Sequence, residues 1–214
     1  MNRREIDELI AKYATAEGTE SSYDQWMGRG EGGSQYDDYS ANVNYSLVRH
    51  FKPQKVLEFG SRTGRCTHDI LLALQRNNQP FVFKSYELED NLRAVAQKNI
   101  DEDFGEGVIT IGGDVTKAED IPEGLDYVFI DNYHDLATTK WVFDVLLPKA
   151  KPGALVHFHD LRFRDDWISD GGGFPDETRL VIEQADKNGG VLTKLYWAWE
   201  TTGQSEGAWF IYNP

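Results

Sequence analysis

The chain has 214 residues, of which 40% are hydrophobic and 13% aromatic, and its formal net charge at pH 7 is −14. These values suit one globular domain, or one domain with a small cap, and they exclude wholesale disorder. The acidic excess disfavours nucleic acids and anionic membranes as partners, because affinity for both depends on positive charge.

A single cysteine, Cys66, excludes an intrachain disulfide and fits a reducing cytosol. The first 20 residues lack the apolar core of a secretion signal. No stretch is apolar over the roughly 18 residues that a membrane span needs. We therefore expect a cytoplasmic protein with no membrane or nucleic-acid partner.

The first 50 residues differ in pattern from the rest of the chain. Apolar residues at spacings of three and four predict a helix over 3–16, and a second helix is predicted over 41–51. Residues 18–40 have no clear period and are rich in Gly, Ser, Tyr and acids, and their aromatic side chains favour a folded lid. We expect residues 1–50 to form an N-terminal helical cap and residues 51–214 a ligand-binding domain.

From residue 55 onward, short apolar segments alternate with helical patterns. These segments predict strands, and the most apolar of them are expected to be buried on both faces of a sheet. The predicted strands are 55–59, 81–86, 108–111, 125–130, 154–158, 194–200 and 208–212. Helices are predicted over 65–77, 90–100 and 134–147, and a further helix begins at Pro175. This order predicts an α/β fold with a doubly wound, Rossmann-like, seven-stranded sheet, mostly parallel, with an antiparallel hairpin at its C-terminal edge.

Ligands of such a sheet bind beyond the carboxyl ends of the strands. The first strand is followed by Gly60-Ser61-Arg62-Thr63-Gly64, whose glycines allow a sharp turn and a close approach to the main chain. This spacing differs from the G-x-G-x-x-G of dinucleotide-binding proteins, so a ligand without phosphates fits better than a pyrophosphate. An ordinary strand-to-helix turn is the alternative.

Acidic residues follow the next two predicted strands. Glu87 is placed to accept hydrogen bonds from two ribose hydroxyls. Asp114 is placed to accept from an adenine amino group, with Val115 against the ring. The alternatives are a solvated surface glutamate and an Asx turn or helix cap. Their order at successive strand ends favours binding of a nucleoside.

With these motifs, residues 50–214 resemble the class I S-adenosylmethionine-dependent methyltransferases. The segment E-F-G-S-R-T-G at 58–64 matches the first motif of that family, Glu87 its ribose acid and Asp114 its adenine acid. The resemblance implies S-adenosyl-L-methionine as cofactor. It places at the cofactor site Glu58, Gly60, Ser61, Gly64, Glu87, Asp114, Val115 and Asp131.

The fourth and fifth strands narrow the resemblance. The string D-Y-V-F-I-D-x-x-H at 126–134, with V-H-F-H-D at 156–160, is similar to the small-molecule O-methyltransferases related to the catechol and caffeoyl-coenzyme A enzymes and to methyltransferase family 24. The resemblance implies methyl transfer to a small-molecule acceptor at a hydroxyl. The segment Pro152-Gly153-Ala154 lacks one of the glycines usual in that group.

Two residues after the fourth strand are candidates for catalysis. Asp131 ends that strand, and His134 stands where the catechol-type enzymes place a catalytic lysine. An imidazole, with an ordinary pKa of about 6.5, suits a general base, and a helix-start residue bonded to backbone is the alternative. In those relatives, acids equivalent to Asp131 and Asp160 bind a divalent metal such as Mg²⁺. Leu161 stands at the position of the next metal ligand in those relatives. The two carboxylates that remain are few oxygen ligands for a hard cation.

The remaining candidates flank the fifth strand and close the chain. We expect His157 to be hydrogen-bonded within the sheet and His159 to lie near the cleft. Residues 162–175 suggest a second lid or a plain surface loop. The aromatic residues alternating from Tyr196 to Trp199 predict a packed sheet face or the contact of a homodimer.

Two other functions stay open on the same scaffold, because a fold does not determine a function. One is a nicotinamide-dependent oxidoreductase, against which the glycine spacing counts. The other is a non-catalytic binding or assembly subunit, against which the acids at positions 87, 114, 131 and 160 count.

Overall fold

Of the 214 residues, the computed structural model describes 3–19, 26, 29, 37–131, 135–159, 161, 175–187, 193–196 and 205–214. The chain folds as two compact units, Arg3–Ile121 and Pro122–Pro214. The boundary expected after residue 50 lies inside the first unit, so the N-terminal helices belong to the same unit as the first strands.

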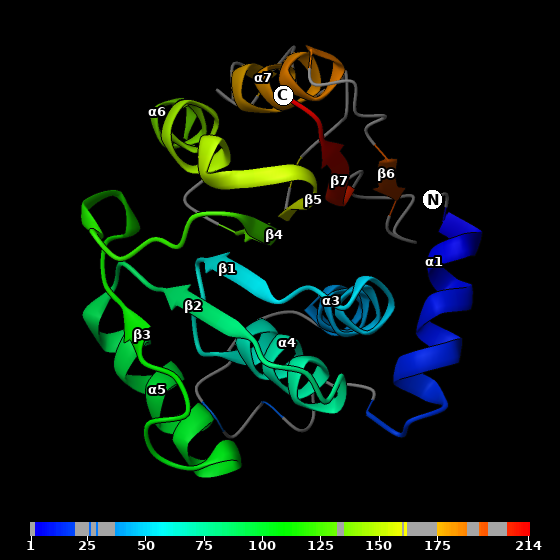
Figure 1. Ribbon diagram of the computed structural model, residues 1–214, viewed down its shortest axis with the longest axis vertical. Helices are drawn as coiled ribbons and strands as arrows, with labels where there is room; N and C mark the ends of the chain where they lie inside the picture. Colours follow the sequence, from blue (N-terminus) through cyan, green and yellow to red (C-terminus); the bar gives the residue numbers. More distant parts are fainter. Residues whose placement is uncertain are drawn as a thin grey trace. The chain divides into compact units, whose positions relative to one another are not determined.

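Three parallel strands form the sheet of the first unit, in the order β3-β2-β1 (Figure 1). β1 spans Lys55–Phe59, β2 spans Val82–Tyr86 and β3 spans Ile111–Gly112. Val56 and Leu57 are fully buried, as predicted for a strand covered on both faces. Because the three strands run in the same direction, their carboxyl ends meet at one edge of this sheet.

The third strand is shorter than the sequence predicted, and the predicted range of 108–111 is wrong. Gln97 takes over the backbone groups that a longer strand would pair. Its Nε2 donates to the carbonyl of Ile109 at 3.1 Å, and its Oε1 accepts from the N–H of Ile111 at 2.8 Å. These backbone groups are satisfied by a side chain, so regular pairing begins only at Ile111.

The helices predicted for the first unit are all present. They are α1 (Arg3–Ile10), which continues as a π-helical turn over Ala11–Thr15, α3 (Asp37–Phe51), α4 (Arg65–Arg76) and α5 (Asp90–Phe104). Figure 1 shows α3 beside α4, and the two helices pack together. The inner face of α4 buries Ile70, Leu71 and Leu74 completely, each worth about 1.5–3 kcal/mol of apolar burial.

The second unit holds the remaining strands, which are β4 (Leu125–Ile130), β5 (Ala150–His159), β6 (Thr193–Tyr196) and β7 (Ser205–Tyr212). β4 and β5 are parallel, β7 runs antiparallel to β5, and β6 runs antiparallel to β7 (Figure 1). A mostly parallel α/β arrangement with an antiparallel pair at the end of the chain is therefore confirmed. The union of all strands in one seven-stranded sheet stays a prediction.

The helix after β4 starts later than the predicted residue 134. It comprises α6 (Leu136–Trp141), a π-helical turn (Val142–Leu146) and a 3-10 turn (Leu147–Lys149). The carboxylate of Asp135 accepts from the N–H of Thr138 at 2.8 Å and caps α6. The cap fixes the start of the helix after Asp135. The next helix, α7, begins at Pro175 as predicted and ends at Lys187.

An aromatic stack forms part of the core of the second unit. The rings of Phe143 and Phe158 are 5.7 Å apart and nearly parallel, and those of Phe158 and Phe210 are 6.5 Å apart. Phe158 and Phe210 come from β5 and β7, whose register places Phe210 opposite Val156. The stack thus joins the parallel and antiparallel parts of this sheet to the helix above it.

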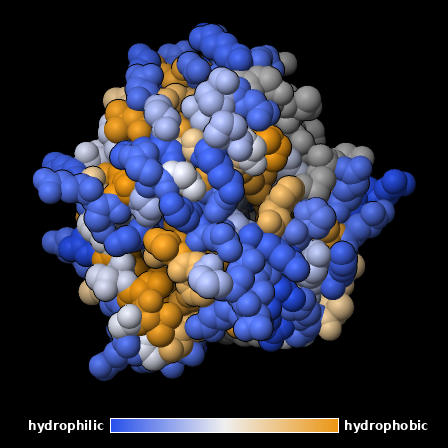
Figure 2. All heavy atoms as spheres, viewed as in Figure 1, coloured by the Kyte–Doolittle hydropathy of each residue, from blue (hydrophilic) through white to orange (hydrophobic). Residues whose placement is uncertain are grey.

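The surface visible in Figure 2 is largely hydrophilic. Figure 2 shows hydrophilic side chains over most of that face, with separate hydrophobic areas between them. Among the helices in the described segments, none is long and apolar enough to cross a membrane.

Candidate functional site

The loop between β1 and α4, residues 60–64, is attached to the end of β2. The N–H groups of Gly60 and Ser61 both donate to the carbonyl of Tyr86, at 2.9 and 3.2 Å. Gly60 and Arg62 have positive φ angles of 98° and 50°. This left-handed backbone is natural for glycine and strained for Arg62, so the surroundings hold the loop in its turn.

Ser61 carries a hydroxyl group in a buried environment. Its side chain is 4% exposed. Within the described part of the chain its hydroxyl has no hydrogen-bond partner. A buried hydroxyl without a partner costs about 1–3 kcal/mol, so this position suits a ligand that supplies a polar group. The chemistry fits the polar amino-acid part of the expected cofactor.

Glu87 follows β2 and lies against the same loop. Its carboxylate is 8% exposed, and Oε2 accepts from the N–H of Arg62 at 2.6 Å while Oε1 accepts from the N–H of Glu89 at 3.0 Å. Each carboxylate oxygen offers two acceptor positions, so one position on each oxygen remains for a ligand hydroxyl. The backbone therefore orients Glu87 at the carboxyl edge of the sheet, and its assignment to the ribose stays a prediction.

Asp114, after β3, caps the short 3-10 helix Val115–Lys117. Its Oδ1 accepts from the N–H and hydroxyl of Thr116, and its Oδ2 pairs with the ammonium of Lys117 at 2.7 Å. The hydrogen bonds from Lys117 and Thr116 lower the pKa of Asp114. The cap considered as an alternative is present, while Val115 is buried and the adenine contacts of both residues stay a prediction.

Glu58 lies in β1, is fully buried, and forms hydrogen bonds with neighbouring side chains of the protein. Its Oε2 accepts from the hydroxyls of Thr67 on α4 and Ser85 on β2, at 2.5 and 2.6 Å. The carboxylate thereby joins two strands and a helix behind the 60–64 loop. Its assignment to the cofactor site stays a prediction, and its contacts in the structure support the loop from beneath.

Gly64 lies where α4 meets α5. It adopts a φ of 93° and ψ of 11° and precedes the first residue of α4. A Cβ at this position would lie 3.2 Å from the Cα and carbonyl oxygen of Ala96 on α5. The glycine therefore serves close helix packing as well as the turn.

In the second unit, Asp131 follows β4 and contacts a histidine of β5. Nδ1 of His159 lies 3.1 Å from Oδ1 of Asp131. An imidazole that donates from Nδ1 fixes the orientation of this carboxylate. His159 is the last residue of β5, and its expected place near the cleft stays a prediction.

The second histidine of β5 lies deeper. The Tyr127 hydroxyl is 3.1 Å from Nδ1 of His157, and both residues are buried. Burial, together with the charge of nearby His159, lowers the pKa of His157 to about 3. His157 is therefore neutral and structural, which confirms the interpretation from the sequence.

Several predicted site residues lie outside the described segments. These are His134, Asp160, residues 162–174, and Trp197 and Trp199. Most of residues 18–40 lie outside them as well. Among the residues that the structure does describe, no three His, Cys, Asp or Glu side chains are grouped as a metal site would need.

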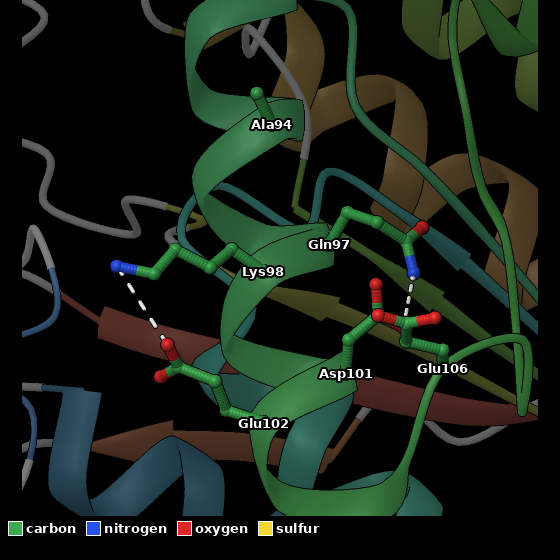
Figure 3. A pocket seen from close by; sticks show the side chains of 6 residues that line it. All are labelled: Ala94, Gln97, Lys98, Asp101, Glu102 and Glu106. Carbon is green, nitrogen blue, oxygen red and sulfur yellow. Dashed lines mark hydrogen bonds and ion pairs between the residues drawn. The ribbon is translucent and has the colours of Figure 1, made fainter.

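A hollow on the surface of the first unit lies elsewhere, along α5 (Figure 3). It is lined by Ala94, Gln97, Lys98, Asp101, Glu102 and Glu106. Gln97 donates to Asp101 at 2.9 Å, and Lys98 pairs with Glu102 at 3.7 Å. These side chains satisfy one another along one helix, so the hollow has the features of a solvated helix face.

Sequence reasoning missed a cluster that joins the N-terminal segment to α3 and α4. The carboxylate of Glu17 accepts from Tyr45 at 2.5 Å, from Arg49 at 2.9 Å and from Arg76 at 3.1 Å. Burial opposes its ionisation, but hydrogen bonds from Arg49, Tyr45 and Arg76 prevail and lower the pKa of Glu17 to about 2. No local sequence pattern predicts such a cluster, because its members are far apart in the sequence.

Comparisons with known proteins identify a matching family. A family described as "Methyltransferase domain" matches residues 57–161. This range holds the end of β1, all of β2, the 60–64 loop, Glu87, Asp114 and Asp131. A comparison with curated proteins gives no match.

Solved structures with the same fold include O-methyltransferases. The O-methyltransferase from Bacillus cereus in complex with SAH is 15% identical, with a TM-score of 0.68, covering 97% of this chain and 90% of that one. The O-methyltransferase TomG from Streptomyces achromogenes, involved in tomaymycin synthesis and solved with SAM, is 18% identical, with a TM-score of 0.66 and the same coverage. The SAH-bound methyltransferase PaMTH1 from Podospora anserina is 11% identical, with a TM-score of 0.65, covering 100% and 97%. At these identities the likeness establishes the fold.

Proposed function

Because a family described as "Methyltransferase domain" matches residues 57–161, we propose that the chain transfers a methyl group from S-adenosylmethionine to a hydroxyl of a small molecule. One observation carries the proposal most strongly. The 60–64 loop and the Glu87 carboxylate meet through the hydrogen bond from the Arg62 N–H, and a carboxylate beside a glycine turn suits the binding of a nucleoside.

The first unit supplies the residues that would hold the cofactor. The Ser61 hydroxyl and the backbone at Gly60 suit its amino-acid part, since the hydroxyl is buried and has no partner in the described segments. Glu87 suits the ribose hydroxyls through the acceptor positions that the backbone leaves on its two oxygens. Asp114 and Val115 suit the adenine, and Glu58 and Gly64 maintain the loop.

When bound, the sulfonium of the cofactor supplies an electrophilic methyl group, and transfer is an in-line displacement. The residues of the chain must align the acceptor oxygen and remove its proton. We assign proton removal to His134, at its imidazole nitrogen, and alignment of the acceptor to Asp131. The contact of His159 with Asp131 supports that role, because it restrains the carboxylate.

We also propose that Asp131 and Asp160 take up a divalent ion such as Mg²⁺ that orients the acceptor. Carboxylates are the ligands that such a hard cation prefers. No step of the proton transfer assigned to His134 depends on that ion.

Titration calorimetry tests the proposal directly. We expect the full chain to bind S-adenosylmethionine and S-adenosylhomocysteine in the micromolar range and NAD not at all. Glu87→Gln should weaken S-adenosylhomocysteine binding about tenfold, since a neutral amide is a poorer partner for two hydroxyls. Glu123→Gln, which removes a carboxylate paired with Lys149 on the surface, serves as the matched control.

Failure of both sulfur ligands to bind below the millimolar range refutes the proposal. Ligand binding with no transfer to any of a panel of phenols, catechols and sugars supports instead a binding subunit on this fold. Transfer to the nitrogen of amines in the same panel contradicts the choice of oxygen.

A further inference from the structure

A buried asparagine on α5 connects the 60–64 loop to the N-terminal segment. Asn99 is 3% exposed, and its Nδ2 donates both to the carbonyl of Thr63 at 2.9 Å and to the carbonyl of Arg29 at 3.0 Å. The two hydrogens of the amide are thereby used on two backbone acceptors from distant parts of the chain. One side chain restrains both segments.

The N-terminal side of this connection is itself anchored on α4 and α5. The guanidinium of Arg29 forms a two-pronged ion pair with Asp103 of α5 and lies over the ring of Trp26, 5.1 Å from its centroid. Trp26 is buried and makes an edge contact with His68 of α4, at 5.5 Å between ring centroids. An ion pair, a cation–π contact and a buried aromatic ring therefore fix the position from which the Arg29 carbonyl meets Asn99.

Asn99 is connected to the site through Thr63, which is the residue after Arg62. The Arg62 N–H holds the Glu87 carboxylate at 2.6 Å, and Arg62 has a strained positive φ. A strained turn keeps its shape only while its surroundings restrain it. The hydrogen bond from Asn99 to the Thr63 carbonyl is such a restraint, one residue from the donor that orients Glu87.

We propose that Asn99 is a positioning residue for cofactor binding, which holds the 60–64 loop in the shape that orients Glu87, and that Arg29 keeps Asn99 in place. This inference rests on the proposed function, because it assumes that the loop and Glu87 bind S-adenosylmethionine. It assigns a binding role to a helix residue and an N-terminal residue that touch no ligand.

Calorimetry with S-adenosylhomocysteine tests the inference. Asn99→Ala removes both donors, and Asn99→Asp keeps the shape while turning the donor into an acceptor that faces two carbonyls. We expect each to raise the Kd at least about tenfold. Arg29→Ala, at a less buried position, should raise it about threefold while leaving the Asn99 amide intact.

Asn77 offers a matched control on the far end of α4. Its Nδ2 donates to the carbonyl of Val48 at 2.9 Å, so it is also an amide that ties two segments together. Asn77→Ala should lower the melting temperature to a degree comparable with Asn99→Ala and change the Kd less than twofold. A purely structural Asn99 would lower the melting temperature in the same way without this difference in Kd.

The outcomes separate the two proposals. A wild-type Kd in the Asn99 variants, or an equal loss in Asn77→Ala, overturns the inference while the proposed function stands. If Asn99→Ala and Asn99→Asp do not fold, Arg29→Ala decides, and an unchanged Kd in that variant overturns the inference. No binding by the wild-type chain refutes the proposed function and this inference with it.

Discussion

Replacing Gly64 by alanine tests the close contact between α4 and α5. The backbone of Gly64 has a φ of 93°, and a Cβ there would lie 3.2 Å from the Cα and carbonyl oxygen of Ala96 and 3.3 Å from its Cβ. An L-residue in this conformation costs about 1–2 kcal/mol of backbone strain. Two of the three contacts are to backbone atoms, which cannot rotate away, and forced overpacking adds about 1–3 kcal/mol. We expect Gly64→Ala to lower the free energy of unfolding by about 3 kcal/mol.

Gly107 separates strain from crowding. It has a positive φ of 79° in the same unit, and a Cβ there would meet nothing within 4 Å. Gly107→Ala should therefore cost only the strain, about 1 kcal/mol. Urea unfolding followed by tryptophan fluorescence measures both losses, with the slope on urea concentration unchanged. Equal losses in the two variants would refute the reasoning, because they would show that the approach of α5 to Gly64 contributes nothing.

Three further outcomes follow from the structure. Glu17 has a folded pKa of about 2 against an ordinary 4.5, so its ion pairs stabilise the fold above pH 4.5 and lose that contribution as the pH falls toward 2. Urea unfolding should show a decline over this range that is about 2–3 kcal/mol smaller in Glu17→Gln than in the wild type, and an equal decline in both contradicts the assignment. Tyr127→Phe removes the hydroxyl beside the neutral imidazole of His157 and should cost about 1 kcal/mol of unfolding free energy, whereas no loss would show that the contact is idle. Chelation with EDTA should slow methyl transfer, because the proposed ion orients the acceptor, and added Mg²⁺ should restore the rate; unchanged turnover removes the metal from the proposal.

The sequence predicted the strands well where apolar runs end in clear signals. β1 and β4 have the predicted bounds of 55–59 and 125–130. Both are short segments in which most residues are apolar or aromatic, and such segments are typical of buried parallel strands. The strand at 108–111 failed because the backbone there pairs with a glutamine side chain, and hydropathy carries no signal for that.

The candidate site was predictable where it depends on position along the strands. Gly60 and Glu87 follow β1 and β2, so parallel strand order alone brings them together. The roles of the individual side chains could be predicted from the sequence less well. Asp114 carries the same carboxylate whether it caps a helix or binds a ligand, and only the contact with Thr116 shows that it caps. Asn99 reads as a solvated helix residue, because its partners lie 36 and 70 residues away in the sequence.

The residues that shape the site converge on α5 more than on the strands. Arg93 donates to the carbonyl of Glu87 at 3.1 Å, and Ala96 packs against Gly64. Gln97 forms hydrogen bonds with the backbone before β3, and Asn99 donates to the carbonyl of Thr63. Successive turns of one helix thus contact the segments after β1 and β2 and the segment before β3. The sequence analysis predicted this helix over 90–100 and assigned no role to its polar positions. A change at any of these positions should therefore disturb the segment that the replaced side chain contacts, and cofactor affinity should respond to several positions along α5.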